Sequence, residues 1–404
     1  MPRPRTYDAP MSDSGPPGGD PFGGIPFLDE MMRLLTRGVG AGDPARQMAR
    51  SLATEGRSEA NVDPADRLAV EELARVAELR VAAATGLSPA REGPFRVEVV
   101  NRTQWADRTL DDYRALFDAL GGALGAVAPA PDGDDDEPLA ALVAQMSRML
   151  GPVLAAMTTG SLVGHLARRA LDAHELPVPR PLSSPSLIVV TNVDEFGRAW
   201  SLDRDELRLW VCLHEVTTAT VLRVPHIRAR LTDLLERHAT SFERDPEALQ
   251  ERLGEIDLAA GPEALEQLQA RLGDPETLLG AVRSPAQEAL QPELTALVAV
   301  VTGYVDHVMD RVGAGLIASY ERLTEALRRR RVEADRADRF VERLLGLELD
   351  QAQYDRGTAF VDGVVERAGE EALDRLFREP RTLPTPAEVD APGLWLARID
   401  LPED

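Results

Sequence analysis

Residues 203–222 read DRDELRLWVCLHEVTTATVL, and they contain the one chemically suggestive segment of a largely helical sequence. Its core-forming residues recur three or four positions apart, the spacing that places side chains on one face of an α-helix. The members of this stripe are Leu207, Trp210, Val211, His214, Thr218, Val221 and Leu222. The spacing predicts one long helix over about 203–222, with His214 on its buried face.

His214 and Glu215 form the first half of a pattern found in zinc hydrolases. In the pattern H-E-x-x-H, two histidines one turn apart reach the same tetrahedral ion, and the glutamate polarises the metal-bound water. Here the residue four positions after His214 is Thr218, whose hydroxyl is a poor zinc ligand. Two interpretations stay open: His214 binds zinc and Glu215 acts as general base, or His214 is a buried, hydrogen-bonded histidine.

The composition indicates a mostly α-helical fold with a few short strands. The chain has 404 residues, of which 44% are hydrophobic and only 4% aromatic, and it is rich in residues that favour helix. A second long periodic segment covers 284–313, where Ser284 and Pro285 suit an N-cap and a first turn. Alternating or β-branched runs at 95–100 and 187–190 predict two short strands.

The distribution of Pro, Gly and acidic residues predicts the domain organisation. Residues 1–24 are dense in Pro and Gly and are expected to form a disordered tail. Residues 25–400 are expected to form a single large helical domain, with an acidic linker near 129–138. The linker begins like a calcium loop at Asp132, Asp134 and Asp136, but it lacks the glycine and the final glutamate that such a loop requires.

The charge argues against two classes of partner. A formal net charge of −23 repels nucleic acid and anionic lipid. Arg328 to Arg331 form a run between Glu325 and Glu333, which we interpret as a solvated helix face with salt-bridge partners. Without an apolar run of about 18 residues or a secretory signal, we expect no membrane span and a cytoplasmic location. The single cysteine, Cys212, is expected to be an ordinary buried thiol.

Seven short segments give the chain a family resemblance. They are residues 20–23 (DPFG), 101–105 (NRTQW), 209–217 (LWVCLHEVT), 224–226 (VPH), 302–310 (TGYVDHVMD), 327–331 (LRRRR) and 345–349 (LGLEL). In order and spacing, the chain resembles an actinobacterial family of zincin-like proteins assigned as hydrolases or zinc-dependent metalloproteases. Part of that family is linked to deazaflavin-cofactor biosynthesis. The resemblance covers roughly residues 20–380 and implies a zincin-like multi-helix domain that uses zinc.

The resemblance also implies roles for individual residues. His214 matches the family's first zinc ligand and Glu215 its general base. Thr218 stands where the family has its second histidine. Thr302 stands where the family has an acidic ligand, usually in a Glu-Gly pair, and it is followed here by Gly303. Two of three ligand positions are therefore changed.

Other residues of the later helix are candidates to complete the site. Asp306 lies one turn after Thr302, so its carboxylate is a candidate second metal ligand; the alternative is an ordinary polar residue or a partner of Arg311. Tyr304 is a candidate for stabilising an oxyanion, and core packing is the alternative for this residue.

Two functions follow from these assignments. The first is a zinc-dependent, peptidase-like metallohydrolase with a weakened metal site. The second is a pseudoenzyme, a non-catalytic helical protein that binds or scaffolds an unidentified protein or peptide. A small-molecule pocket between helices is a third interpretation, which rests only on the general tendency of helical bundles to form clefts.

Overall fold

The computed structural model describes residues 43–125, 155–242, 284–333 and 336–401. Apart from Asp43, every residue described below belongs to one unit, Pro44–Asp404. The predicted tail at 1–24 and the predicted acidic linker at 129–138 lie outside the described residues.

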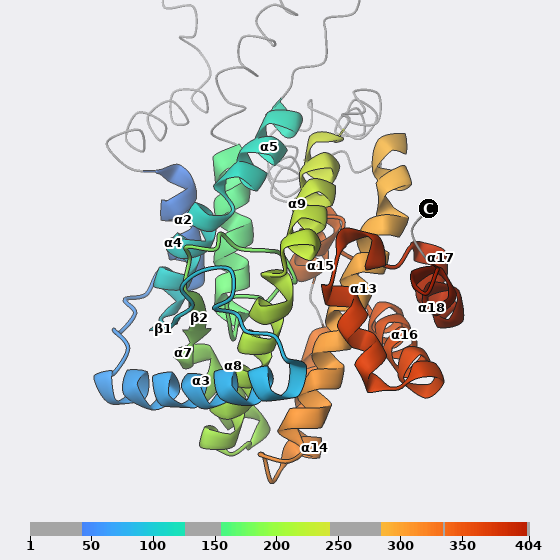
Figure 1. Cartoon of the computed structure of the whole chain (residues 1–404). Helices are drawn as coiled ribbons and strands as arrows, with labels where there is room; N and C mark the ends of the chain where they lie inside the picture. Colours follow the sequence, from blue (N-terminus) through green and yellow to red (C-terminus); the bar gives the residue numbers. More distant parts are fainter. Residues whose placement is uncertain (1–42, 126–154, 243–283, 334–335, 402–404) are drawn as a thin grey trace, which may run out of the picture. The chain divides into compact units, whose positions relative to one another are not determined.

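The unit Pro44–Asp404 is mostly α-helical, as the composition predicted (Figure 1). Residues 155–169 are also helical. The remaining elements are α2 (Pro44–Ala53), α3 (Pro64–Thr85), β1 (Val97–Val100), α4 (Arg102–Asp112), α5 (Arg114–Gly125), β2 (Ser186–Val189), α7 (Val190–Trp200), α8 (Arg204–Leu222), α9 (Pro225–Thr240), α13 (Pro285–Gly313), α14 (Tyr320–Val332), α15 (Arg336–Leu344), α16 (Gln351–Ala368), η2 (Glu370–Phe377), η3 (Pro380–Thr382), α17 (Pro386–Asp390) and α18 (Pro392–Ile399).

The two long helices that the sequence predicted begin at capping residues. Asp203 accepts hydrogen bonds from the backbone N–H groups of Asp205 and Glu206, which have no carbonyl partner within α8. Ser284 and Gln287 form a reciprocal capping box at the start of α13. The helix predicted over 203–222 is therefore confirmed, and so is the helix predicted over 284–313.

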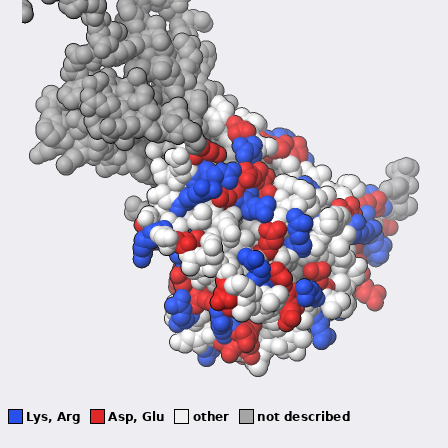
Figure 2. All heavy atoms as spheres, turned by 90° about the vertical axis from the view of Figure 1, so that its left-hand side faces the viewer, with Lys and Arg blue, Asp and Glu red and all other residues white. Residues whose placement is uncertain are grey.

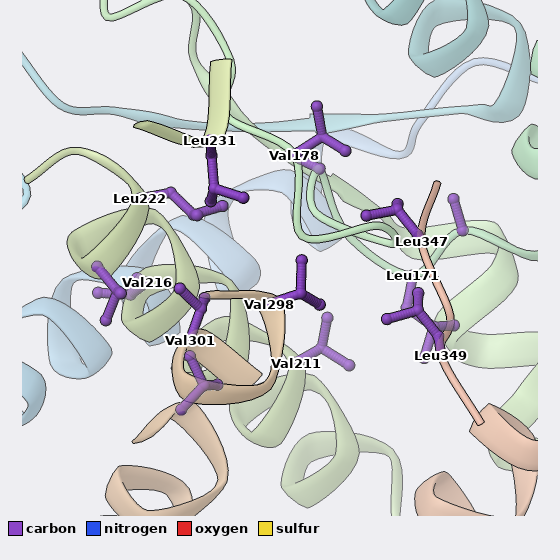
Figure 3. Packing of buried hydrophobic residues seen from close by; sticks show 14 of the residues in the cluster. Leu171, Val178, Val211, Val216, Leu222, Leu231, Val298, Val301, Leu347 and Leu349 are labelled. Atoms are coloured by element: carbon purple, nitrogen blue, oxygen red, sulfur yellow. The ribbon is translucent and has the colours of Figure 1, made fainter. Parts of the chain in front are cut away.

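The hydrophobic core joins α8, α9 and α13. Figure 3 shows Val211, Val216 and Leu222 of α8 beside Leu231 of α9 and Val298 and Val301 of α13. All six side chains are buried. Because α8 and α13 pack against each other through these aliphatic groups, polar residues on the same two helices are held at fixed relative positions.

A close approach of two glycines fixes α13 against α16. A Cβ atom added at Gly303 of α13 would overlap the backbone carbonyl group of Gly357 in α16. A Cβ atom added at Gly357 would in turn overlap the carbonyl oxygen of Ala299. Only glycine permits this contact, and it brings α16 next to the segment of α13 that carries Thr302 and Asp306.

The two predicted strands form a small parallel sheet, in which Val99 of β1 pairs with Ile188 of β2. The segment after the helix at 155–169 adds to this sheet, since Asp172 makes an isolated antiparallel bridge with Ile188. The indole N–H of Trp105 also donates to the Asp172 carbonyl oxygen at 2.8 Å. The sheet therefore serves to hold the backbone of Asp172 in place.

Among the described residues, no helix combines the length and apolar character that crossing a bilayer requires.

Candidate functional site

A cavity of about 80 Å³ lies between α8, α13, α14, α16 and the segment that follows the helix at 155–169. It contains both of the residues from which the sequence predicted a metal site, His214 and Asp306. The polar residues of its wall are Arg169, Asp172, His174, Glu175, Trp210, His214, Thr218, Thr302, Asp306, Arg330, Arg331, Asp338, Glu342 and Tyr354. Helices α8 and α13 therefore both contribute residues to this polar cavity.

One face of α8 supplies Trp210, His214 and Thr218, which follow one another at intervals of four residues. The ring of Trp210 stacks on the imidazole of His214, with centroids 5.2 Å apart and planes 9° from parallel. Thr218 is only 4% exposed, and its hydroxyl has no hydrogen-bond partner among the described residues. The hydroxyl thus stands one turn beyond His214 without a partner.

Asp172 fixes the orientation of His214. Its Oδ2 lies 2.8 Å from His214 Nδ1, and its Oδ1 accepts the backbone N–H of His174 at 3.0 Å. Burial alone would raise the pKa of Asp172, but the neighbouring His214 and His174 outweigh it and hold that pKa below its usual value. An ionised Asp172 selects the tautomer of His214 with hydrogen on Nδ1, so that Nε2 is the ring nitrogen available to another group.

Glu215 has a different partner. Its side chain is fully buried, and both carboxylate oxygens lie 3.0 Å from His174 Nδ1. Its Oε2 also accepts the backbone N–H of His174, at 3.3 Å. Glu215 is not among the described residues that line the cavity. Its contacts join α8 to the segment containing Asp172, and its role as general base stays a prediction.

Asp306 is held by an arginine on α14. Nη1 of Arg331 lies 2.9 Å from each of the two Asp306 carboxylate oxygens, and its guanidinium lies over the ring of Tyr354, 5.2 Å from the centroid. Burial alone would lower the pKa of Arg331, but Asp306 outweighs it and raises that pKa, so the guanidinium stays charged. The suggested partner Arg311 instead pairs with Glu370.

The arginine run of α14 is only partly a solvated face. Arg328 and Arg329 are exposed and pair with acidic residues, as the sequence predicted. Arg330 and Arg331 turn inward, with side chains 16% and 17% exposed. Arg330 reaches Glu175 at 2.9 Å across the cavity wall. The interpretation of the whole run as solvated was therefore wrong for its last two residues, because the packing of α14 buries them.

Ion pairs extend from the cavity wall to the surface. Arg169 pairs with both Glu175 and Asp338. On the face shown in Figure 2, acidic and basic side chains interleave rather than separate into patches of one sign. Charges on the wall are therefore largely neutralised by neighbouring residues.

These residues do not fit a zinc centre. Zinc sites in enzymes use three protein ligands about 2 Å from the ion, and His214 Nε2 is one suitable donor. The hydroxyl of Thr302 already donates to Val298 O at 3.0 Å, and Asp306 is bound to a cation. In the described part of the chain, no three His, Cys, Asp or Glu side chains are grouped so that they could hold a metal ion.

Tyr304 lies elsewhere. Its ring packs edge-on against Phe377 of η2, with centroids 4.7 Å apart, and it is not among the described residues of the cavity wall. His307 on the same helix contacts Glu370 at 3.2 Å. Cys212 is 1% exposed, which agrees with the buried thiol predicted from the sequence. The role of Tyr304 in stabilising an oxyanion stays a prediction that no contact of its ring supports.

Sequence reasoning missed four cavity residues: Asp172, His174, Arg331 and Tyr354. Asp172 and His174 precede their partners, His214 and Glu215, by about 40 positions, and the backbone at 172 is held by the small sheet. Arg331 was considered only as a member of a charged run. No periodic pattern marks these residues, so only the charge of Arg331 and its distance from Asp306 along the chain offered a signal.

The chain matches one protein-family model and is similar to a solved structure. A family model described as "Zincin-like metallopeptidase" matches residues 42–396. Among solved structures, the chain is similar to a protein from Chloroflexus aurantiacus that is called a "putative hydrolase with a novel fold". The two share 24% sequence identity with a TM-score of 0.55, over 89% of this chain and 98% of the other. At that identity the likeness shows the fold alone. A search of curated proteins gave no match.

Proposed function

Because the chain belongs to the zincin-like metallopeptidase family, we propose that it keeps a hydrolase-like cavity but uses it to bind a ligand without zinc. In this proposal the metal site of the family has been lost, and the positive charge of Arg331 stands beside the residues that remain. The chain would then be a pseudoenzyme, with the guanidinium of Arg331 in place of a metal ion beside Asp306.

One observation carries the proposal: Arg331 binds the carboxylate that was the candidate replacement ligand. The side chains of Asp306 and Arg331 are each 17% exposed, and Nη1 of Arg331 lies 2.9 Å from Oδ1 of Asp306. A zinc ion bound by Asp306 would have to displace the guanidinium or share the carboxylate with it, and two neighbouring positive charges repel each other. His214 is then left without a second strong ligand.

The first test is the zinc content of the purified full-length chain. We expect far less than one zinc per chain by elemental analysis, and no change in thermal stability after treatment with a chelator. One zinc per chain, together with a loss of stability after chelation, would refute the proposal.

A second test restores the family ligands. Thr218→His with Thr302→Glu supplies the missing imidazole and carboxylate, and adding Arg331→Gln removes the competing charge. We expect the triple variant to bind zinc more tightly than the double variant, as measured by calorimetry. The matched control is Thr218→Asn with Thr302→Gln, which introduces amides of similar size but no zinc ligand. Equal zinc binding by the control and the restored variants would show that these positions are not the metal site of the family.

The hydrogen bond between Asp172 and His214 supports a second candidate function, hydrolysis without a metal. A carboxylate that holds Nδ1–H leaves Nε2 free to accept a proton from water. This candidate predicts hydrolysis of peptides or p-nitrophenyl esters that survives a chelator and disappears in His214→Gln. The control is His307→Gln, since His307 contacts Glu370 outside the cavity. Equal activity in both variants would exclude His214 as the base.

A further inference from the structure

Two buried polar groups on α8 lack partners at the cavity. Trp210 and Thr218 are each 4% exposed and both line the cavity. The indole N–H of Trp210 and the hydroxyl of Thr218 make no hydrogen bond with any described residue. A buried polar group without a partner costs about 1–3 kcal/mol, so two such groups at one cavity point to a molecule that satisfies them.

The opposite wall offers further unused donors. Arg331 uses only Nη1 on Asp306, and within the described ranges no hydrogen bond involves its Nε and Nη2 groups. The hydroxyl of Tyr354 also has no hydrogen bond to a described residue. Burial raises the pKa of Tyr354 to about 12, so the phenol keeps its proton at neutral pH. The ring of Tyr354 supports the Arg331 guanidinium and keeps both donors at the same end of the cavity.

The balance of donors and acceptors defines the ligand. Among the described residues, the unused groups are mainly donors, namely an indole N–H, a phenol, guanidinium N–H groups and a hydroxyl, whereas Nε2 of His214 is an unused acceptor. The described part of the wall also carries five carboxylates, and each has a basic partner: Asp172 is bound to His214, Asp306 to Arg331, Glu175 to Arg330, Asp338 to Arg169 and Glu342 to Arg339. A cationic ligand would therefore compete with an existing partner for each of these carboxylates. A ligand with acceptor oxygens would meet donors that are free.

From these contacts we propose that the cavity binds a small carboxylate, with its oxygens between Arg331, Tyr354 and the indole N–H of Trp210. This inference rests on the proposed function, because it requires that no zinc occupies the space beside His214. A cavity of about 80 Å³ has room for roughly half a dozen water-sized groups, which limits the ligand to a short carboxylic acid or a carboxylate at the end of a larger molecule.

The test is calorimetric titration of the full chain with propionate, propionamide and inorganic phosphate, at constant ionic strength in a buffer free of carboxylates. We expect saturable binding of propionate and at least tenfold weaker binding of the amide, which has the same shape but no charge. Equal affinity for the two would overturn the proposal in favour of a neutral carbonyl ligand. Stronger binding of phosphate would overturn it in favour of a tetrahedral anion, and no binding of any probe would show that the cavity holds water alone.

Conservative variants locate the site. Tyr354→Phe, Trp210→Phe and Thr218→Val each remove one hydrogen-bonding group and keep the shape of the side chain. We expect Tyr354→Phe and Trp210→Phe to weaken propionate binding by roughly fivefold each, and Thr218→Val by less. The control is Thr217→Val, whose hydroxyl donates to Leu213 O away from the cavity. Unchanged affinity in both aromatic variants would place the carboxylate elsewhere.

Zinc measured on the same samples separates the two proposals. Propionate binding by a zinc-free chain, unaffected by a chelator, supports both. If propionate binding disappears with zinc after chelation, the ligand binds to the metal and both proposals fail. If the chain is zinc-free but binds no propionate, only the carboxylate site fails and the loss of the metal site stands.

Discussion

Replacing Thr218 by valine is expected to stabilise the protein, although the residue lies in the cavity that we assign to function. Thr218 and its neighbour Thr217 are both buried on α8, at 4% and 1% exposure. The hydroxyl of Thr217 donates to Leu213 O at 2.7 Å, whereas that of Thr218 has no partner among the described residues. The same substitution at the two positions therefore removes a satisfied hydroxyl in one case and an unsatisfied hydroxyl in the other.

The two substitutions are expected to change the free energy of unfolding in opposite directions. Removing an unsatisfied buried hydroxyl recovers a desolvation cost of about 1–3 kcal/mol, and a methyl group of similar shape fills the space. Removing a hydroxyl that makes one hydrogen bond costs about 0.5–1.5 kcal/mol, partly offset by the burial of the added methyl. We therefore expect the free energy of unfolding to be higher in Thr218→Val than in Thr217→Val by about 2 kcal/mol.

The assay is urea unfolding followed by tryptophan fluorescence, in a buffer without carboxylates so that no ligand occupies the cavity. The comparison requires that the free energy of unfolding depends equally on urea concentration in both variants. An equal slope shows that both variants expose the same amount of surface on unfolding. If Thr218→Val is no more stable than Thr217→Val, the Thr218 hydroxyl has a partner in solution. In that case the argument that the cavity lacks a satisfying group would fail.

Three further predictions test the packing and charges around the site. Gly303→Ala should lower the free energy of unfolding by about 3 kcal/mol, since the added Cβ would overlap the Gly357 carbonyl group. A loss under about 1 kcal/mol would show that α13 and α16 can move apart. Cys212 is buried, and burial raises the pKa of its thiol. The folded chain should therefore resist alkylation by iodoacetamide at pH 8, measured by mass spectrometry, and react only in denaturant. Rapid alkylation of the folded chain would disprove the burial of Cys212. Burial alone would raise the pKa of Asp194, but hydrogen bonds from Arg204 and Arg208 outweigh burial and hold that pKa below its usual value. The stabilising contribution of Asp194 should therefore be present above about pH 4 and be lost as the pH falls. Urea unfolding of Asp194→Asn should show a lower free energy of unfolding than the native chain at pH 7, with the difference disappearing in acid; a difference independent of pH would contradict this.

The sequence predicted the helices that build the site because their signals are local. The stripe around His214 and the cap at Ser284 each depend on residues within a few turns, and both helices appear where their spacing placed them. The β-branched runs at 95–100 and 187–190 likewise appear as strands β1 and β2. The sequence did not indicate that the two strands pair in parallel with each other, because pairing depends on segments far apart in the chain.

The contacts inside the cavity were not predictable in the same way. The interaction of Asp172 with His214 depends on how the sheet holds a loop, and the inward turn of Arg331 depends on how α14 packs. A run of four arginines has no internal pattern that distinguishes buried from exposed members. Asp306 and His214 line the same cavity, but the hydrogen-bond partner of Asp306 is Arg331, 25 residues further along the chain.

The contact between Gly303 and Gly357 places a purely architectural residue directly beside a residue of the cavity wall, Thr302. Gly303 lies where two backbones touch, so any larger residue would push the helices apart whether or not the protein catalyses a reaction. Thr302, its neighbour, lines the cavity and donates its hydroxyl to Val298 O. Two adjacent positions therefore have separate duties: one sets the approach of two helix backbones, and the other presents a side chain to the cavity. Belonging to a family does not by itself define the chemistry of such a cavity, which depends on side chains such as Thr302 and Thr218.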